Sequence, residues 1–249
     1  ISFTEALQHF QSVELSESRG KVRAPGRRGI LAALLRYLCG PPRLRPQLQG
    51  EQELVMAMAQ CALDDSEWVH MRILQTIYQQ LTRSRLGCPR FGAHWEELGF
   101  QGRRGSNPLP GEIPRPIPKT HSNLPWSNSV LSQLPEPFPG RRVFQLSFPN
   151  AGILVVFQNF PFCIMSVNIT RIVIQALQEE RLSRECNRRQ QVIGVLNDLY
   201  AAAFLRLSHL WKQQHGTIAD AGFFLKELEL STKKKPRQLL RSLEAYLSR

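Results

Sequence analysis

The sequence predicts an all-α protein, an irregular multi-helix bundle interrupted by a long proline-rich insertion. Apolar residues recur at three- and four-residue intervals near both ends of the 249-residue chain, which is the spacing of one helix face. Ten of its seventeen prolines fall within 103–158, where missing amide donors prevent a continuous helix. We therefore expect three parts: helical residues 1–102, a largely disordered insertion over 103–158, and helical residues 159–249.

Start signals and apolar stripes place the helices of the first part. Ser2 and Glu5 form a capping box, in which each side chain bonds to the other residue's backbone amide. A short helix should follow, to about residue 11. The same reasoning predicts three further helices: 30–38, 51–63 and 69–81, the last with cap side chains from Asp64–Ser66.

The helical pattern returns after residue 159. We expect one helix over 164–182 and another from residue 185 or 187 to about 213. Apolar side chains lie on nearly every face of the latter, which predicts a central position in the bundle. A second capping box, Thr217–Asp220, should start the next helix, and Pro236 suits the first turn of the last one.

The formal net charge of +12 at pH 7 is large. It suits an acidic partner: nucleic acid, an anionic membrane face or an acidic protein surface. Solvated basic faces and cations at helix C-termini are common, so charge alone does not select among these partners. The basic residues form short clusters, mostly at helix ends or in loops: 21–23 with 27–28, 103–104, 141–142, 188–189 and 233–237.

Other features predict a cytoplasmic protein. The best apolar run, 151–157, is far shorter than the roughly 20 residues of a membrane helix. Ile1 begins an amphipathic segment rather than a signal peptide, and the missing initial Met suggests part of a longer protein. The cysteines are odd in number, scattered and without C-x-x-C spacing, which indicates reduced thiols: Cys39, Cys61, Cys88, Cys163 and Cys186. The six histidines lack metal-ligand spacing and no phosphate-binding loop is present, so we expect neither a metal nor a cofactor.

Residues 94–102 read His-Trp-Glu-Glu-Leu-Gly-Phe-Gln-Gly. This segment resembles the first half of the signature of ELMO-domain proteins, Trp-x-x-x-Gly-Phe-Gln-Gly, which continues into an Asn-Pro, an acidic residue and an arginine. The segments 1–11 and 159–188 also resemble this family. In all, the resemblance covers about 1–102 and 159–249.

The resemblance implies a GTPase-activating protein for small GTPases of the Arf and Arf-like group, rather than an enzyme in its own right. The partner would be the GTPase in its GTP form, and activity would depend on the arginine that closes the signature. Association with the cytoskeleton is a further expectation. The partner-binding residues implied are Trp95, Gly99, Phe100, Gln101 and Gly102. A structural role is the alternative, because such aromatics are more often core anchors and the glycine permits a turn.

The second half of the signature is missing. If Asn107-Pro108 is taken as the Asn-Pro pair, the register places the acidic residue at Gly111 and the arginine at Ile113. The nearest later basic residue is Arg115, and the spacing gives no support for it as a stand-in. An alternative exon and an error in the gene model are both open as explanations. We therefore expect impaired or absent activity.

Two other functions stay open. The chain could be a binding-only module whose segments 114–118 and 135–139 offer proline-rich peptides to SH3-type domains. It could also bind nucleic acid or an anionic membrane surface through its basic clusters. This last function ranks below the others, and nucleic acid ranks lowest, because no motif that reads RNA or DNA accompanies the charge.

Overall fold

The computed structural model describes residues 1–12, 42–61, 64, 66–82, 87 and 162–248. In these ranges the secondary structure is entirely helical, with eight α-helices and two short 3₁₀ turns. The predicted all-α class is therefore confirmed for the described part. The expected helix over 30–38, the insertion over 103–158 and its apolar stretch lie outside these residues.

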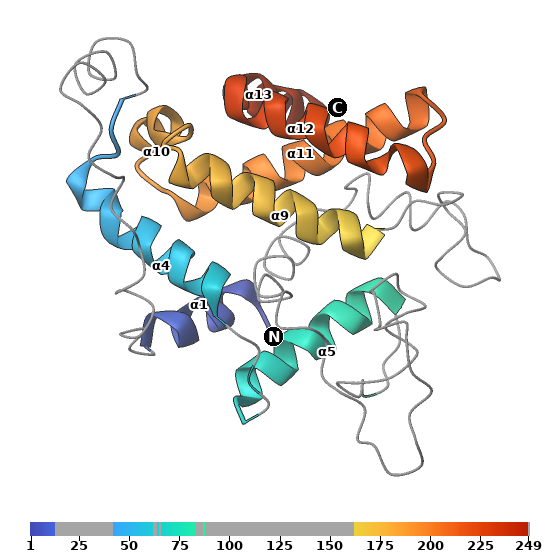
Figure 1. Cartoon of the computed structure of the whole chain (residues 1–249). Coiled ribbons are helices and arrows are strands. Elements are labelled where there is room, and N and C mark those ends of the chain that lie inside the picture. Colours follow the sequence, from blue (N-terminus) through green and yellow to red (C-terminus); the bar gives the residue numbers. More distant parts are fainter. Residues whose placement is uncertain (13–41, 62–63, 65, 83–86, 88–161, 249) are drawn as a thin grey trace.

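The first three described helices lie together in the lower part of Figure 1 and at its left. The predicted capping box is present, because the Glu5 amide donates to Ser2 Oγ at 3.2 Å and the Ser2 amide to Glu5 Oε2 at 2.8 Å. In the turn before the third helix, the Asp64 carboxylate accepts the amide and hydroxyl of Ser66. The helices are α1 (Phe3–Ser12), α4 (Gln49–Gln60, after the 3₁₀ turn η1, Pro46–Leu48) and α5 (Trp68–Thr82).

The remaining helices form the upper part of the molecule in Figure 1. Thr217 and Asp220 form the second predicted capping box, and Pro236 occupies the first turn of the last helix, as expected. The elements are α9 (Phe162–Gln178), α10 (Ser183–Arg189), α11 (Ile193–Gln213), the 3₁₀ turn η4 (Ile218–Asp220), α12 (Ala221–Lys234) and α13 (Pro236–Leu247).

The single helix predicted from residue 185 or 187 to 213 is wrong. Two separate helices, α10 and α11, cover this range, and between them Gln190 adopts a left-handed conformation with φ 55°. The Gln191 amide then donates back to the Cys186 carbonyl at 3.3 Å. This bond satisfies a carbonyl that the ended helix leaves without an amide partner, so α11 begins in a new direction.

The helix predicted over 164–182 ends four residues early, at Gln178. Glu180 has φ 60°, and the Arg181 amide donates to the Ala176 carbonyl at 3.0 Å. This left-handed stop lets the chain turn into α10 without leaving the last carbonyls of α9 unpaired.

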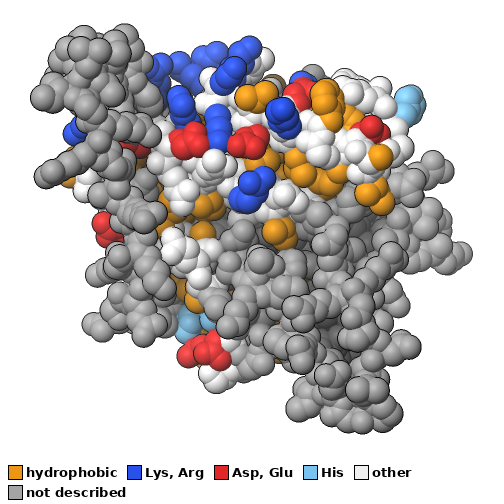
Figure 2. Space-filling model, viewed as in Figure 1, with side chains coloured by type: hydrophobic (Ala, Val, Ile, Leu, Met, Phe, Trp, Pro, Cys, Tyr) orange, Lys and Arg blue, Asp and Glu red, His pale blue; other side chains and the backbone are white. Residues whose placement is uncertain are grey.

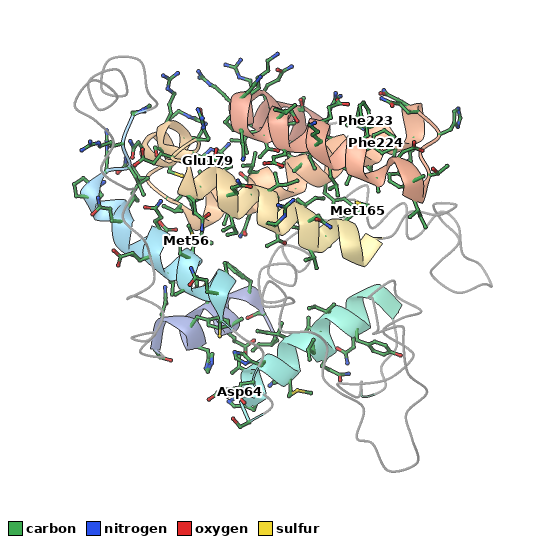
Figure 3. All side chains as sticks on the ribbon, in the orientation of Figure 1. Met56, Asp64, Met165, Glu179, Phe223 and Phe224 are labelled. Atoms are coloured by element: carbon green, nitrogen blue, oxygen red, sulfur yellow. The ribbon has the colours of Figure 1, made fainter. Side chains whose placement is uncertain are left out.

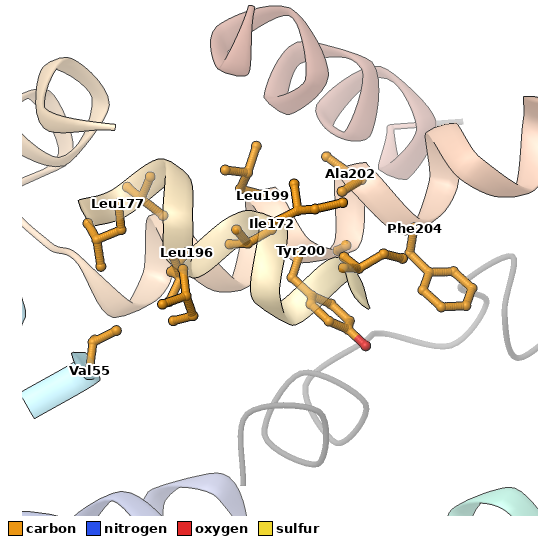
Figure 4. Close-up of a cluster of buried hydrophobic side chains, with 14 of the residues drawn as sticks. Val55, Ile172, Leu177, Leu196, Leu199, Tyr200, Ala202 and Phe204 are labelled. Carbon is orange, nitrogen blue, oxygen red and sulfur yellow. The ribbon is translucent and has the colours of Figure 1, made fainter. Parts of the chain in front are cut away.

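The hydrophobic core is organised around α11, as its apolar residues predicted. Leu199 on α11 and Ile172 on α9 are both fully buried. Figure 4 shows them in one cluster with Leu177 of α9 and with Leu196 and Tyr200 of α11. Val55 of α4 belongs to the same core. Because α4 precedes residue 61 and α9 follows residue 161, the two ends of the chain build one core.

Candidate functional site

The site residues implied by the sequence lie outside the described part of the chain. These are Trp95, Gly99, Phe100, Gln101 and Gly102 of the signature, together with the stand-in Arg115. Their roles stay predictions. The described residues show how the scaffold on either side of them is joined and which charged and apolar surfaces it carries.

A single carboxylate joins α4 to α11. The Val192 amide donates to Glu51 Oε2 at 2.9 Å, and the Ile193 amide donates to Glu51 Oε1 at 2.8 Å. These amides lie at the start of α11, where the helix has unpaired N–H groups and a partial positive charge. Glu51 therefore caps a helix that begins about 140 residues later in the sequence.

Amide side chains make a second contact beside Glu51. Asn187 Oδ1 accepts the Arg45 amide at 2.9 Å, and Asn187 Nδ2 donates to the Arg43 carbonyl at 2.8 Å. Gln47 also bonds to Gln190. The chain leading into α4 is thus fixed to the end of α10, which positions the N-terminal part relative to the C-terminal helices.

Ion pairs hold the C-terminal helices together. Lys233 Nζ lies 2.8 Å from Glu179 Oε1, beyond the end of α9, and 2.8 Å from Glu229 Oε1 on α12. Hydrogen bonds to Glu179 and Glu229 raise the pKa of Lys233. Figure 3 labels Glu179 near the end of α9. Arg189 likewise pairs with Asp198 on α11 and Glu244 on α13, so cations of two predicted basic clusters bind carboxylates of the bundle itself.

A histidine pair lies where α1 meets α5. His70 is 4% exposed, and its Nδ1 accepts the Asp64 amide at 3.0 Å. Its ring stacks on Phe10 with centroids 5.7 Å apart and lies 6.0 Å from the His9 ring. Because only the neutral imidazole can accept at Nδ1, this hydrogen bond requires the neutral form of His70. Burial lowers the pKa of His70, and the neighbouring His9 lowers it further.

We expect this arrangement to make stability fall in mild acid. The unfolded chain takes up a proton on His70 near pH 6.5, whereas the folded chain does so only at lower pH. Stability is therefore complete above about pH 6.5 and decreases as the pH falls toward the folded pKa, by at most about 1.4 kcal/mol per pH unit. Urea unfolding at pH 7.5 and 5.5 measures this change.

The variant His70→Asn tests the assignment, because the amide oxygen can accept the Asp64 amide without titrating. It should lose part of the difference between pH 7.5 and 5.5. His215 is exposed beyond the end of α11, so His215→Asn serves as the matched control and should keep the wild-type difference. An unchanged pH dependence in His70→Asn would contradict the prediction.

The described residues contain no group of three or more His, Cys, Asp or Glu side chains that could hold a metal ion. Cys61 and Cys186 are free thiols, and burial raises the pKa of Cys186 to about 12. A raised pKa keeps the thiol protonated and unreactive. None of the helices in these ranges is long and apolar enough to cross a membrane.

Sequence reasoning missed the outward face of α12. Phe224 and Leu228 are buried, but Phe223 and Leu230 are exposed. Phe223 and Phe224 are adjacent, and consecutive helix positions point about 100° apart, so the two rings point in different directions from α12. Figure 3 labels both on α12. Phe223 shares its side of the helix with Lys226, and an aromatic residue on the polar side of an amphipathic helix is the signal in the sequence that its ring can lie in solvent.

Comparison with known proteins decides which family this scaffold represents. The model of the ELMO/CED-12 family matches residues 53–108 and 133–225, which is more than half of the chain. The chain belongs to the ELMO/CED-12 family.

Curated ELMO-family relatives match across the whole chain. This chain is 50% identical over 248 residues to ELMO domain-containing protein 3 of Bos taurus. It is 49% identical over 249 residues to ELMO domain-containing protein 3 of Homo sapiens. In each case the chain spans 62% of the relative's length. No solved structure matches the chain.

The family match also bears on the middle of the chain. It extends into 103–158 from both sides and leaves out 109–132. Together with the relatives, which match across the whole chain, this corrects the expectation that the resemblance covers only about 1–102 and 159–249. The omitted range contains Gly111 and Ile113, the positions where the ELMO signature register would place its acidic residue and arginine, and also Arg115. The flanking matched residues include α5, α9, α10, α11 and the part of α4 from residue 53 onward. Asn187 lies within the match, whereas Glu51 lies just before it.

Proposed function

We propose that this ELMO-family chain binds an Arf or Arf-like small GTPase in its GTP form and stimulates GTP hydrolysis weakly or not at all. The observation that carries the proposal is membership of the ELMO/CED-12 family with half of its signature, residues 95–102, in place. The break in the pattern at the arginine position supports the loss of activity.

The chemistry explains why one missing residue matters so much. Charge on the transferred phosphoryl group increases at its oxygens in the transition state, and a guanidinium held in a dry interface stabilises that charge. An arginine supplied in this way accelerates hydrolysis by about 10³- to 10⁵-fold. The Ile113 side chain cannot donate a hydrogen bond or carry charge, so we expect GTPase binding to remain where catalysis is lost.

The contacts of α4 with α10 and α11 support the binding half of the proposal. They tie the chain before the signature to the chain after residue 162, and a binding surface needs a rigid scaffold of this kind. Trp95, Phe100 and Gln101 would provide the contacts, with Gly99 and Gly102 allowing close approach of the backbone. Arg115 would contribute little to the chemistry.

The test uses the purified chain with an Arf-like GTPase. We expect tighter binding to the GTP form than to the GDP form by calorimetry. Single-turnover hydrolysis should rise by less than about tenfold, compared with about 10³-fold or more for an arginine finger. Equal affinity for both nucleotide forms would refute the binding proposal. A thousandfold stimulation would refute the proposed loss of activity.

Two variants with matched controls refine the assignment. Gln101→Ala should weaken binding about five- to tenfold if its side chain lies at the centre of the interface, whereas Gln133→Ala should not. Arg115→Lys should leave any residual stimulation unchanged, as should Arg141→Lys. A selective loss in Arg115→Lys would show that Arg115 replaces the missing arginine. Circular dichroism checks that each variant is folded.

The proline-rich sequence favours a second candidate, a ligand for SH3-type domains. The segment Pro114-Arg115-Pro116-Ile117-Pro118 falls within the range 109–132 that the family model leaves out. Proline-rich peptides bind aromatic grooves of SH3 domains because their extended conformation is already formed. We propose a cytoplasmic, cytoskeleton-associated location for both functions. A panel of immobilised SH3 domains tests this candidate. It would be eliminated if none of the domains captured the wild-type chain.

A further inference from the structure

The outward side of α12 and the turn before it carry large apolar side chains in solvent. Ile218 is 62% exposed, Phe223 is 63% exposed and Leu230 is 48% exposed. Their positions are opposite to the buried face of α12, which is formed by Phe224, Leu228 and Thr232. These apolar groups therefore protrude from the bundle instead of closing its core.

Lysine and arginine residues accompany these apolar groups. Along the exposed line of α12, Lys226 lies between Phe223 and Leu230, and Lys234 follows at the same helical spacing. Lys235 and Arg241 extend the basic surface to α13 and are also exposed. Figure 2 shows hydrophobic side chains over α12 with Lys and Arg among them, and further Lys and Arg along the upper edge. We call Ile218, Phe223, Lys226, Leu230 and Lys234 the α12 face.

The acidic residues of this region are already engaged within the protein. Asp220 accepts from the Thr217 amide and hydroxyl, and Glu229 binds Lys233. Glu227 binds Arg206, and Glu244 binds Arg189. Within the described residues, no ion pair is formed by Lys226, Lys234, Lys235 or Arg241. The α12 face therefore presents apolar groups and uncompensated positive charge to solvent.

We propose that the α12 face is a docking surface for an anionic lipid bilayer. A bilayer surface can receive Phe223 and Leu230 together, because both lie on one line along the helix. Lys226 between them can cover apolar surface with its methylene chain while its ammonium reaches the lipid headgroups. The cores of protein interfaces are instead depleted in lysine, which makes an acidic protein a poorer fit to this line.

The inference concerns α12 and α13 and stands whether or not the chain acts on a GTPase. The free energy of lipid binding should be the sum of two contributions. Insertion of apolar side chains favours binding in proportion to the area buried, and each lysine near an anionic surface adds attraction that salt screens. Removal of either contribution should therefore weaken binding without unfolding the protein.

Vesicle flotation with the intact 249-residue chain tests the proposal. Wild type should bind vesicles of phosphatidylcholine with phosphatidylserine, bind much less to phosphatidylcholine alone, and lose binding as salt increases. The double variant Phe223→Ser and Leu230→Ser should bind these vesicles at least roughly tenfold more weakly than wild type. The double variant Lys226→Gln and Lys234→Gln should bind roughly 30-fold more weakly.

Matched controls come from exposed residues elsewhere. Trp68 is 59% exposed at the start of α5, so Trp68→Ser controls for loss of an exposed apolar side chain. Arg43 and Arg45 are exposed before α4, so the double variant Arg43→Gln and Arg45→Gln controls for loss of two charges. Both controls should bind lipid more strongly than the corresponding α12 variants.

A second measurement reports insertion directly. In Phe223→Trp, the added tryptophan should shift its emission to the blue on anionic vesicles and be quenched by brominated lipid chains. Wild-type protein that stays in solution with anionic vesicles would overturn the proposal, as would α12 variants that bind like wild type. Binding that ignores lipid charge would also overturn it. Melting temperatures verify that the surface variants are folded.

Discussion

Glu51→Ala is expected to lower the free energy of unfolding by about 2–4 kcal/mol. The reason is that Glu51 accepts the amides of Val192 and Ile193 at 2.9 and 2.8 Å. Hydrogen bonds to a charged group contribute about 1.5–3 kcal/mol each, and alanine leaves both amides at the start of α11 without that acceptor. Some replacement by water reduces the total. Urea unfolding followed by circular dichroism measures the loss.

Two further variants separate this contact from a general effect of charge. Glu51→Gln keeps one acceptor oxygen, so we expect it to lose about 1–2 kcal/mol. Glu53 is exposed on the same helix, and Glu53→Ala should change stability by no more than about 0.5 kcal/mol. If the alanine variants at residues 51 and 53 were equally stable, the proposed link between α4 and α11 would be wrong.

Leu199→Ala is expected to cost about 2–5 kcal/mol, the usual range when a buried leucine is truncated. Leu199 has no exposed surface and belongs to the cluster around α11. The loss combines the transfer of the removed carbons with the cavity left among neighbours on several helices. Because α9, α12 and α13 all pack on α11, those neighbours cannot easily close the space.

Leu247 provides the matched control for the same chemical change. It lies at the end of α13 and is 48% exposed, so Leu247→Ala should cost less than about 0.5 kcal/mol. Thermal unfolding of the two variants side by side gives the comparison, with about 2–4 °C expected per kcal/mol in a chain of this size. Similar melting temperatures would contradict the central position assigned to α11.

Local signals predicted local structure well. The capping boxes at Ser2 and Thr217 depend on side chains only three residues apart, and both are present. The break before α11 is different. Its start is capped by Glu51, about 140 residues earlier, and no window of sequence around Gln190 contains that partner. Apolar periodicity alone therefore joined two helices that tertiary contacts keep apart.

The candidate sites show the same division. The signature residues Trp95–Gly102 could be recognised from their pattern, because a family motif is a string of neighbours. The exposed α12 face could be found only with the bundle in view. Helical spacing places Phe224 with Leu225 and Leu228 on the apolar positions of this helix, and the packing of α12 on α9, α11 and α13 shows that Phe223 is left in solvent.

The joint between α4 and α11 has a consequence for how the gene can vary. The free-energy cost of holding two parts of a chain together rises only with the logarithm of the length of a flexible segment between them, by about 0.6 kcal/mol for each doubling. Splicing or insertion between α5 and α9 could therefore lengthen or replace the sequence that connects them at small thermodynamic expense. The same joint makes a transcript that stops within the connection unable to produce a stable product, because its α4 would lack the helix it caps.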